Sequence, residues 1–557
     1  MKRLFTSIST LACAAIMCAQ VPTTSPVNVS ELEVGAADFW TIDFKDGTTT
    51  VVWNQANLGW SKVQMFMNSI RNGESLMTDG NPVFVGGDYG TRSCTMFEHR
   101  QTFADADDNI LVITNDCRNA EAQDNFSGTV SSYALYKVNK NGEMLWDEPL
   151  DLGRGLSGVH TSVSVTQLSD GSYVVAWTCI TDDLSLFPQD ENRAYVMMER
   201  VSKDGKLVWD APKTWMSADE DICYNYLFDG GDNEYVIVSL RGMEMYMVAN
   251  RFDANGNPVW DGETIITCGR YANGSTAVYP IFDIQSDGNG GVMASWHDFS
   301  ENPELEVVRM AHIDRNGQHT YDTGVGGTRV TNIIDAGLAY RSHLPKYVED
   351  KATGDIFMVH KVVEPVYQLL SSLVLQKLDK DGNVTWKPEG VLVEDIQRRS
   401  IDCSRIVLDK DGNPVVFYLE YIAPDADPDA RGCHIYAQKF NKTDGTKMWE
   451  KREEVSINYE YPFISDFRVS PLINGDHWII TWTGQATPSM VNSKPALFMT
   501  SFTDNGTTKV VNVNEEQGDD ATVRYFNLNG ENVSDSNLTP GFYIKRQGQH
   551  VTKVLVK

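Results

Sequence analysis

A short turn motif recurs along almost the whole chain, at intervals of 51 to 69 residues. In each copy an Asn-Gly or Asp-Gly turn is followed by a bulky residue four positions after the glycine. These bulky residues are Met77, Trp146, Trp209, Trp260, Tyr321, Trp386, Trp449 and Val510. Self-similarity at a period of this length predicts a repeat architecture, in which each unit packs against its neighbours.

A second series of turns lies between the turns of the first, and each of its members precedes an apolar run. Its positions are Gly47, Asp108, Gly171, Gly230, Gly288, Gly354, Gly412 and Gly475. Asn-Gly and Asp-Gly suit hairpin turns because both residues tolerate a positive φ. Apolar residues alternate around the turns, and long helical periodicity is absent. Each unit is therefore predicted to contain two β-hairpins, for example residues 162–177 and 194–209.

Four antiparallel strands repeated eight times favour an all-β fold, a β-propeller of about eight four-stranded blades over residues 31–512. A single four-stranded sheet cannot bury both faces, whereas blades packed around an axis bury them all. The recurrent tryptophans are then expected to fill the space between neighbouring blades. Seven blades with a separate cap at the weak first unit is one alternative, and a row of independent β-sandwiches is another.

The chain is acidic, with a formal net charge of −29. Nucleic acid is excluded as a partner because its binding needs a basic footprint. The charge also argues against an anionic membrane surface or a polyanionic glycan as the main partner. Beyond residue 19, no stretch approaches the roughly 18 apolar residues that span a bilayer, so no transmembrane segment is expected in the mature chain.

Seven of the nine cysteines lie beyond residue 19, too scattered for a disulfide scaffold and without a CxxC pair. Candidate bridges are Cys94–Cys117 and Cys403–Cys433. The first residues have the pattern of a signal peptide, because Lys2 and Arg3 precede a short apolar segment at 11–19. Residues 1–19 are therefore assigned to the signal peptide and 20–30 to an N-terminal linker.

The last residues, 524–557, are predicted to form a small unit of short antiparallel strands separated by Gly530, Pro540–Gly541 and Gly548. They contain FNLNG at 526–530, PGFYI at 540–544 and KVLVK at 553–557. This pattern resembles the short C-terminal sorting domain of proteins exported by the type IX (Por) secretion system. The resemblance covers about 35 of the 557 residues.

The resemblance implies a sorting domain at 521–557 after a linker at 513–520, with the secretion machinery as its partner. It also implies a location outside the cell or on the outer-membrane surface, reached through the periplasm.

The sequence contains no HExxH pair, G-x-S-x-G elbow, P-loop or dinucleotide fingerprint, so no catalytic or cofactor-binding residue is assigned. The segment DKDGN, at 379–383 and 409–413, resembles part of a calcium loop but lacks the other ligands of such a loop. Alternating Asp425, Asp427 and Asp429 form a better cation candidate. Solvated turns are the favoured interpretation of both, so calcium stays an open alternative and no cofactor or metal ligand is predicted.

Strand direction places all the tight turns on one face of the propeller and the long connections on the opposite face. The long connections include 116–131, 181–193, 298–304, 423–432 and 484–494. Binding residues are often found on such loops. The candidate binding residues are Phe126, Phe187, Phe299, Asp425, Asp427 and Asp429.

These observations favour a secreted or cell-surface binding or adhesion protein whose ligand is a glycan or a protein. The alternative is a secreted glycan- or peptide-processing enzyme with carboxylates near the propeller channel. No catalytic residue can be assigned from the sequence, and the interpretation inclines away from an enzyme.

Overall fold

The structure is a computed structural model. It describes residues 27–31, 38–56, 63–77, 81–91, 102–116, 132–152, 159–181, 193–217, 223–241, 246–268, 282–302, 305–333, 337, 341–363, 371–394, 400–422, 432–456, 463–475, 477–486, 495–504, 508–509, 523–526, 532–533, 541–547 and 550–556. The chain divides into two compact units, residues 1–71 with 75–509 and residues 72–74 with 510–557.

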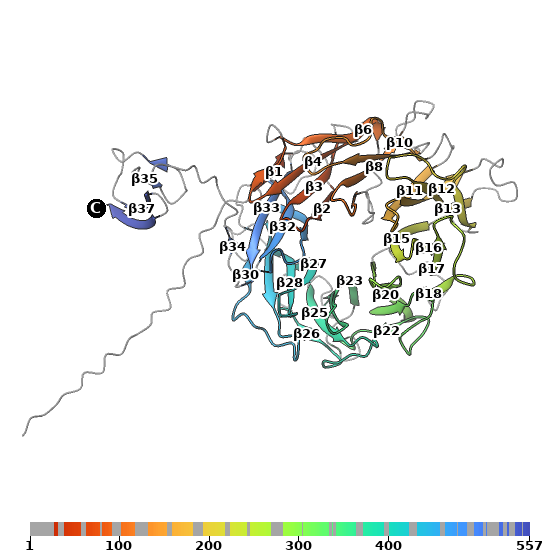
Figure 1. The fold of residues 1–557 in the computed structure, drawn as a ribbon. Coiled ribbons are helices and arrows are strands. Elements are labelled where there is room, and N and C mark those ends of the chain that lie inside the picture. The colour runs from red at the N-terminus through yellow and green to blue at the C-terminus, as the bar shows by residue number, and fades with distance from the viewer. Residues whose placement is uncertain are drawn as a thin grey trace, which may run out of the picture. The chain divides into compact units, whose positions relative to one another are not determined.

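The first unit is a propeller of eight antiparallel blades around a central axis (Figure 1). Blade 1 contains β2 (Phe39–Asp43), β3 (Thr49–Ala56), β4 (Val63–Arg71), β5 (Glu74–Ser75) and β6 (Val83–Thr91). Blade 2 contains β7 (Thr102–Ala104), β8 (Ile110–Asp116), β9 (Ser132–Val138) and β10 (Leu150–Asp151). Blade 3 contains β11 (Val159–Gln167), β12 (Tyr173–Thr181), β13 (Arg193–Val201) and β14 (Lys213–Ser217). Blade 4 contains β15 (Cys223–Gly231), β16 (Glu234–Arg241), β17 (Tyr246–Asp253) and β18 (Thr264–Cys268).

The remaining blades follow the same order from the axis outward. Blade 5 contains β19 (Phe282–Ser286), β20 (Val292–Asn302), β21 (Leu305–Ile313) and β22 (Thr328–Arg329). Blade 6 contains β23 (Arg341–Asp350), β24 (Asp355–Val363), β25 (Ser371–Leu378) and β26 (Val391–Leu392). Blade 7 contains β27 (Ser400–Leu408), β28 (Pro414–Ile422), β29 (Gly432–Lys439) and β30 (Glu453–Glu454). Blade 8 contains β31 (Phe463–Val469), β32 (His477–Gln485), β33 (Ala496–Thr503), β34 (Thr508–Lys509) and β1 (Val27–Glu31).

This architecture confirms the predicted all-β propeller with eight blades, and the alternatives with seven blades or separate sandwiches are wrong. The described residues contain no helix, so none of them forms a helix able to span a membrane.

Blade 8 is completed by the N-terminal strand. Strand β1 pairs antiparallel with β33, with Val27 opposite Met499 and Glu31 opposite Ala496. Val29 is buried and packs in one cluster with residues of β33 and of blade 1. Residues 27–30 were expected in the linker at 20–30, so the propeller begins earlier than expected. The strand was missed because five residues without a hairpin turn carry no repeat signal.

The repeated bulky residues join neighbouring blades. Among the described residues, six of them lie under the turn glycine of the next repeat: Met77, Trp146, Trp209, Trp260, Tyr321 and Trp386. A Cβ atom would come within 2.7 Å of the Trp146 ring at Gly205 and within 2.5 Å of the Tyr321 ring at Gly382. Three of the indole N–H groups also donate to a backbone carbonyl of that turn, as Trp146 does to Lys203 O at 3.2 Å. The predicted role of the repeat between blades is therefore confirmed, including at the degenerate copies Met77 and Tyr321.

Ion pairs show that both series of turns share one face. Lys140, in a second-hairpin turn, lies 2.8 Å from Asp46 Oδ2 and 3.0 Å from Asp108 Oδ2, both in first-hairpin turns. Lys203 and Asp107 make the same kind of contact at 2.7 Å. Exposed pairs of this kind add little stability. Their value is geometric, because they place turns of both series on the same face of the propeller.

The second unit contains a four-stranded antiparallel sheet, in the order β36-β35-β37-β38. Its strands are β35 (Val523–Phe526), β36 (Asn532–Val533), β37 (Gly541–Gln547) and β38 (His550–Val556). The short antiparallel strands predicted for residues 524–557 are thus present. Their proposed role in sorting stays a prediction.

Candidate functional site: the axial channel

Most of the binding residues predicted from the sequence lie outside the described residues. This applies to Phe126, Phe187, Asp425, Asp427 and Asp429. Phe299 belongs to β20 by its backbone, but its side chain lies outside the described part. The predicted loop-face site therefore stays a prediction.

The DKDGN segments have a structural role. Asp379 Oδ1 accepts hydrogen bonds from the backbone N–H groups of Asp381 and Asn383, and Asp409 does the same with Asp411 and Asn413. Each carboxylate thus braces its own turn. Among the described residues, no group of three or more His, Cys, Asp or Glu side chains is placed to hold a metal ion.

The proposed Cys403–Cys433 bridge is wrong, because both residues are thiols in the structure. Cys94 and Cys117, the other candidate pair, lie outside the described residues. Burial, opposed by the nearby Arg405, raises the pKa of the Cys403 thiol to about 11. Cys403 is therefore a neutral thiol near pH 7 and not a nucleophilic thiolate.

The first strand of each blade lies nearest the axis, and several of these strands contain bulges. Register shifts occur in β11, β23, β27 and β31. Three of the bulges contain a residue with positive φ: Ser162, Leu344 and Cys403. Because a bulge changes the direction of neighbouring side chains, it can direct a long polar side chain toward the channel without disturbing the outer strands.

One position of the inner strand recurs in five blades. In each of these blades, the residue at this position pairs with a residue of the second strand that comes directly before an aromatic residue or a histidine. The pairs are Trp40 with Val52, Asp283 with Ser295, Lys346 with Val359, Arg405 with Phe417 and Arg468 with Thr481. These five side chains, here called the axial ring, line one cavity of about 510 Å³. The repeat therefore builds a level of equivalent side chains around the channel.

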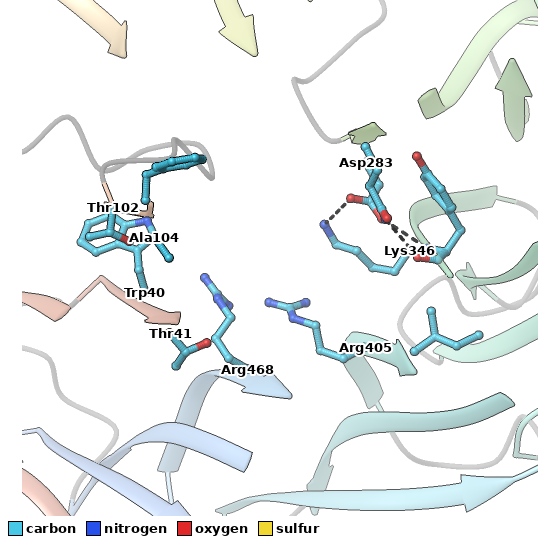
Figure 2. Close-up of a pocket in the computed structure, with 12 residues that line it drawn as sticks. Trp40, Thr41, Thr102, Ala104, Asp283, Lys346, Arg405 and Arg468 are labelled. Atoms are coloured by element: carbon cyan, nitrogen blue, oxygen red, sulfur yellow. Dashed lines mark hydrogen bonds and ion pairs between the residues drawn. The ribbon is translucent and has the colours of Figure 1, made fainter. Parts of the chain in front are cut away.

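Figure 2 shows Arg405 and Arg468 extending into the same cavity, with Trp40 on one side and the Lys346–Asp283 pair on the other. The other lining residues are Thr41, Thr102, Phe103, Ala104, Gln285, Tyr347 and Ile406. Three of the five axial-ring residues are cationic, in a chain whose net charge is strongly negative. The cavity is thus a local exception to the charge of the molecule.

The two arginines share one carboxylate. Arg405 Nη2 lies 3.0 Å from Asp466 Oδ1, and Arg468 Nη1 donates to Asp466 Oδ2. Burial favours the neutral form of Asp466, but Arg468 and Arg405 outweigh it and lower the pKa of this carboxyl. Asp466 is therefore ionised at neutral pH, and the two arginines with one aspartate carry a net charge of about +1.

Aromatic rings of adjacent strands hold the guanidinium groups in place. Arg468 of blade 8 lies over the ring of Phe39 in blade 1, at 5.2 Å from the centroid, and Arg405 of blade 7 lies over Phe467 in blade 8, at 5.5 Å. Backbone carbonyls accept from both arginines, Ser404 O at 2.9 Å and Phe467 O at 3.1 Å. These contacts order both side chains before any ligand arrives.

Lys346 and Asp283 form the other charged part of the cavity. Their Nζ and Oδ1 atoms lie 3.9 Å apart. Asp283 Oδ2 also accepts from the backbone N–H of Tyr347 at 3.2 Å and from Gln285 Nε2 at 3.1 Å. Asp283 therefore links blades 5 and 6 and neutralises Lys346, so the excess positive charge lies at the arginines.

A serine–histidine contact occurs away from the cavity. His360 Nδ1 lies 2.6 Å from Ser342 Oγ, and Nε2 lies 3.2 Å from Thr331 Oγ1. His360 is completely buried and Ser342 is 1% exposed. A substrate could not reach this serine, so the contact serves the packing of blade 6.

Sequence analysis missed the axial ring, although a signal was present. Trp40, Arg405 and Arg468 each lie seven residues before the turn glycine of their first hairpin. Lys346 and Asp283 depart from this spacing by one and two residues. Aligning the repeats on these glycines would have brought the two arginines and the tryptophan together.

No protein-family model matches this sequence, and no curated protein matches it. Several solved structures are similar. A polysaccharide lyase of family PL25, an ulvan lyase, is 9% identical with a TM-score of 0.42, over 85% of this chain and 94% of the lyase. The β-propeller domain of the Trilobed protease from Pyrococcus furiosus is 10% identical with a TM-score of 0.35, over 73% and 93%. A GH93 α-L-arabinofuranosidase of Fusarium graminearum is 11% identical with a TM-score of 0.30, over 61% and 92%.

Similarity at this level says nothing about ligand or activity. The chain's own strands and side chains define its class, an eight-bladed β-propeller protein with a cation-rich cavity on its axis.

Proposed function

We propose that this protein is a secreted or cell-surface β-propeller that binds a glycan in its axial cavity. The observation that carries the proposal is the cavity itself, about 510 Å³ in volume and lined by inner strands of six blades. Ligand sites of small molecules are concave, lie within about 300–1,000 Å³ and combine apolar surface with a few placed polar groups. Here Trp40 and Phe103 supply the aromatic surface, and the charged residues of the axial ring supply the polar groups.

The size of the cavity favours a saccharide over a folded protein. A protein partner needs a surface of about 800 Å² on each side of the contact, whereas a short oligosaccharide fits a cavity of this volume. The walls are strands held by neighbouring blades, which suits a site that must keep its shape without ligand.

The alternative of a glycan- or peptide-processing enzyme needs an acid and a base that face the same substrate. Glycoside hydrolysis, for example, uses two carboxyl groups on either side of the bond. Among the described lining residues Asp283 supplies a carboxylate, and its oxygens are engaged by Lys346, Tyr347 and Gln285. This arrangement favours binding over catalysis.

Binding is tested with the chain lacking residues 1–19. A glycan array is followed by calorimetric titration with the best oligosaccharide, for the wild type and for Trp40→Ala. The proposal predicts at least tenfold weaker binding by Trp40→Ala and unchanged binding by Met448→Ala, an exposed apolar residue of the tight-turn face. Binding that is insensitive to Trp40→Ala, or bond cleavage without stable binding, would overturn the proposal.

Export is a separate part of the proposal. The basic and apolar start of the chain and the resemblance of residues 526–557 to a type IX sorting domain support it. In a host with that system, deletion of residues 521–557 should leave folded propeller in the periplasm. Undiminished appearance of the truncated protein outside the cell would contradict the assignment.

A further inference from the structure

We infer that the axial cavity selects an acidic oligosaccharide, and that Arg405 and Arg468 bind its carboxylate or sulfate group. This inference rests on the proposed function, because it names the class of glycan for the same cavity. It revises the expectation from net charge, which argued against a polyanionic glycan.

The first support is the charge balance within the cavity. In the described part of the cavity, Asp466 lies between Arg405 and Arg468, and Asp283 lies beside Lys346, so three cationic side chains accompany two carboxylates. The side chains of Arg405 and Arg468 are only 17% and 25% exposed. Charges that are partly withdrawn from water are screened less by salt than surface charges and act more strongly on a ligand.

The second support is the hydrogen-bonding state of Arg468. Among the described residues, Arg468 donates only through Nη1, to Asp466 and to the carbonyl of Phe467. Its Nε–H and the two N–H groups of Nη2 have no partner there. Figure 2 shows this guanidinium directed into the cavity. A planar guanidinium with two adjacent donors fits a carboxylate or sulfate through paired hydrogen bonds.

The third support is the position of the aromatic residues. Trp40 belongs to the same axial ring as the two arginines, and Phe103 of the neighbouring blade lines the same cavity. An aromatic ring packs against the apolar face of a sugar while the arginines hold its charged group. The hydroxyl groups of Thr41 and Thr102 add partners suited to sugar hydroxyls. Together these groups favour an acidic sugar over an inorganic anion.

The net charge of the whole chain does not oppose this binding. The Debye length is about 8 Å at physiological ionic strength, so acidic groups on the outer surface are largely screened from the axis. Charges at short range inside the cavity then decide the local potential. The acidic exterior instead slows the approach of long polyanions, which favours short oligosaccharides or chain ends.

The test uses calorimetric titration of the chain lacking residues 1–19. The probes are oligogalacturonates, sulfated galactose oligomers and neutral cello-oligosaccharides of similar length. We expect binding of at least one acidic probe, weaker binding at 0.5 M than at 0.05 M NaCl, and at least tenfold weaker binding of the neutral probe. The carboxylate and sulfate arms identify which acidic group is preferred.

Arg468→Gln is the decisive variant, since Asp466 keeps Arg405 as its partner. It should weaken binding of the acidic probe at least tenfold. Arg468→Lys should restore part of the affinity, because lysine restores the positive charge but not the paired N–H donors of the guanidinium. Lys203→Gln is the matched control, because it removes one lysine from an exposed ion pair on the tight-turn face. It should bind as the wild type does, and circular dichroism should show all three variants folded.

The outcomes separate the two proposals. If the neutral probe bound more strongly than the acidic probes, and Trp40→Ala abolished that binding, the inference of an acidic ligand would be wrong. The proposal of a glycan site in the axial cavity would still hold. Acidic binding that is equally strong in Arg468→Gln would overturn the role of the arginines. Binding of no saccharide by the wild type would overturn the proposed function itself.

Discussion

Trp260 of blade 4 lies directly beneath Gly317 of blade 5. The indole N–H donates to the carbonyl of Arg315 at 2.9 Å, and a Cβ atom at position 317 would come within 2.8 Å of the ring. Gly317 has a φ of +77°. Both the positive φ of the turn and the close approach of the Trp260 ring therefore require glycine at position 317. The same contact between a bulky side chain and a turn glycine recurs between other neighbouring blades.

Trp260→Ala should lower the free energy of unfolding by about 3–5 kcal/mol, as expected for truncation of a buried large aromatic residue. The ring is 8% exposed and belongs to the cluster that joins blades 4 and 5. Urea unfolding followed by circular dichroism measures the change. Val259→Ala is the control, because the side chain of Val259, next to Trp260 in the sequence, is 46% exposed. Its truncation should lower the free energy of unfolding by less than about 1 kcal/mol. Similar losses in both variants would show that Trp260 does not join the blades.

Gly317→Ala and Gly262→Ala separate backbone strain from steric contact. Both glycines have positive φ, but a Cβ at Gly262 would meet no atom within 4 Å. Gly262→Ala should cost about 1–3 kcal/mol from strain alone. Gly317→Ala should cost a further 1–3 kcal/mol because the Trp260 ring must shift. If the two variants lost the same free energy of unfolding in this assay, the Trp260 ring would be able to move aside without a measurable cost.

Val29→Asp tests closure of the ring by strand β1. Val29 is 3% exposed and packs with residues from blades 8 and 1, so a charge there should cost about 3 kcal/mol or more. Differential scanning calorimetry should show a clearly lower melting temperature. Val325→Asp introduces the same charge at a residue that is 56% exposed, and this variant should have nearly the same melting temperature as the wild type. If both variants melt alike, β1 does not contribute to closure.

Asp43, on the inner strand of blade 1, gives a prediction for pH. Burial, partly offset by the hydrogen bond from Thr49, raises the pKa of this carboxyl from 3.8 to about 6. The folded protein keeps the proton up to about pH 6, whereas the unfolded chain releases it near pH 4. The contribution of Asp43 to the free energy of unfolding therefore falls as the pH rises from about 4 to 6.

Asp43→Asn should remove this fall, so that its stability relative to the wild type increases between pH 4 and pH 6. Urea unfolding at several pH values measures the difference. Asp204→Asn, at an exposed turn position, should follow the wild type throughout. A constant difference between Asp43→Asn and the wild type over this range would contradict the raised pKa.

The blades could be predicted from the sequence because their signal is local and repeated. A turn glycine such as Gly205 lies four residues from Trp209, and both requirements appear in every copy. Strand β1 could not be predicted in the same way, since its partner β33 lies more than 450 residues away in the sequence.

The axial cavity is less visible in the sequence for a related reason. Arg405, Arg468 and Trp40 belong to different blades, and only closure of the ring brings them to one cavity. The bulges at Leu344 and Cys403 shift the inner-strand register. Neither residue is a typical turn residue, so the sequence pattern does not predict the bulges. Net charge says little about the cavity, because it averages the charges of the whole chain, whereas three of the five axial-ring residues are cationic.

The most direct measurement is a crystal structure of the chain lacking residues 1–19 and 521–557 with a bound acidic oligosaccharide at physiological ionic strength. The account predicts an oxyanion of the sugar within hydrogen-bonding distance of Arg468 and Arg405, with a sugar ring against Trp40. A saccharide bound on the outer surface, with none in the axial cavity, would contradict the account.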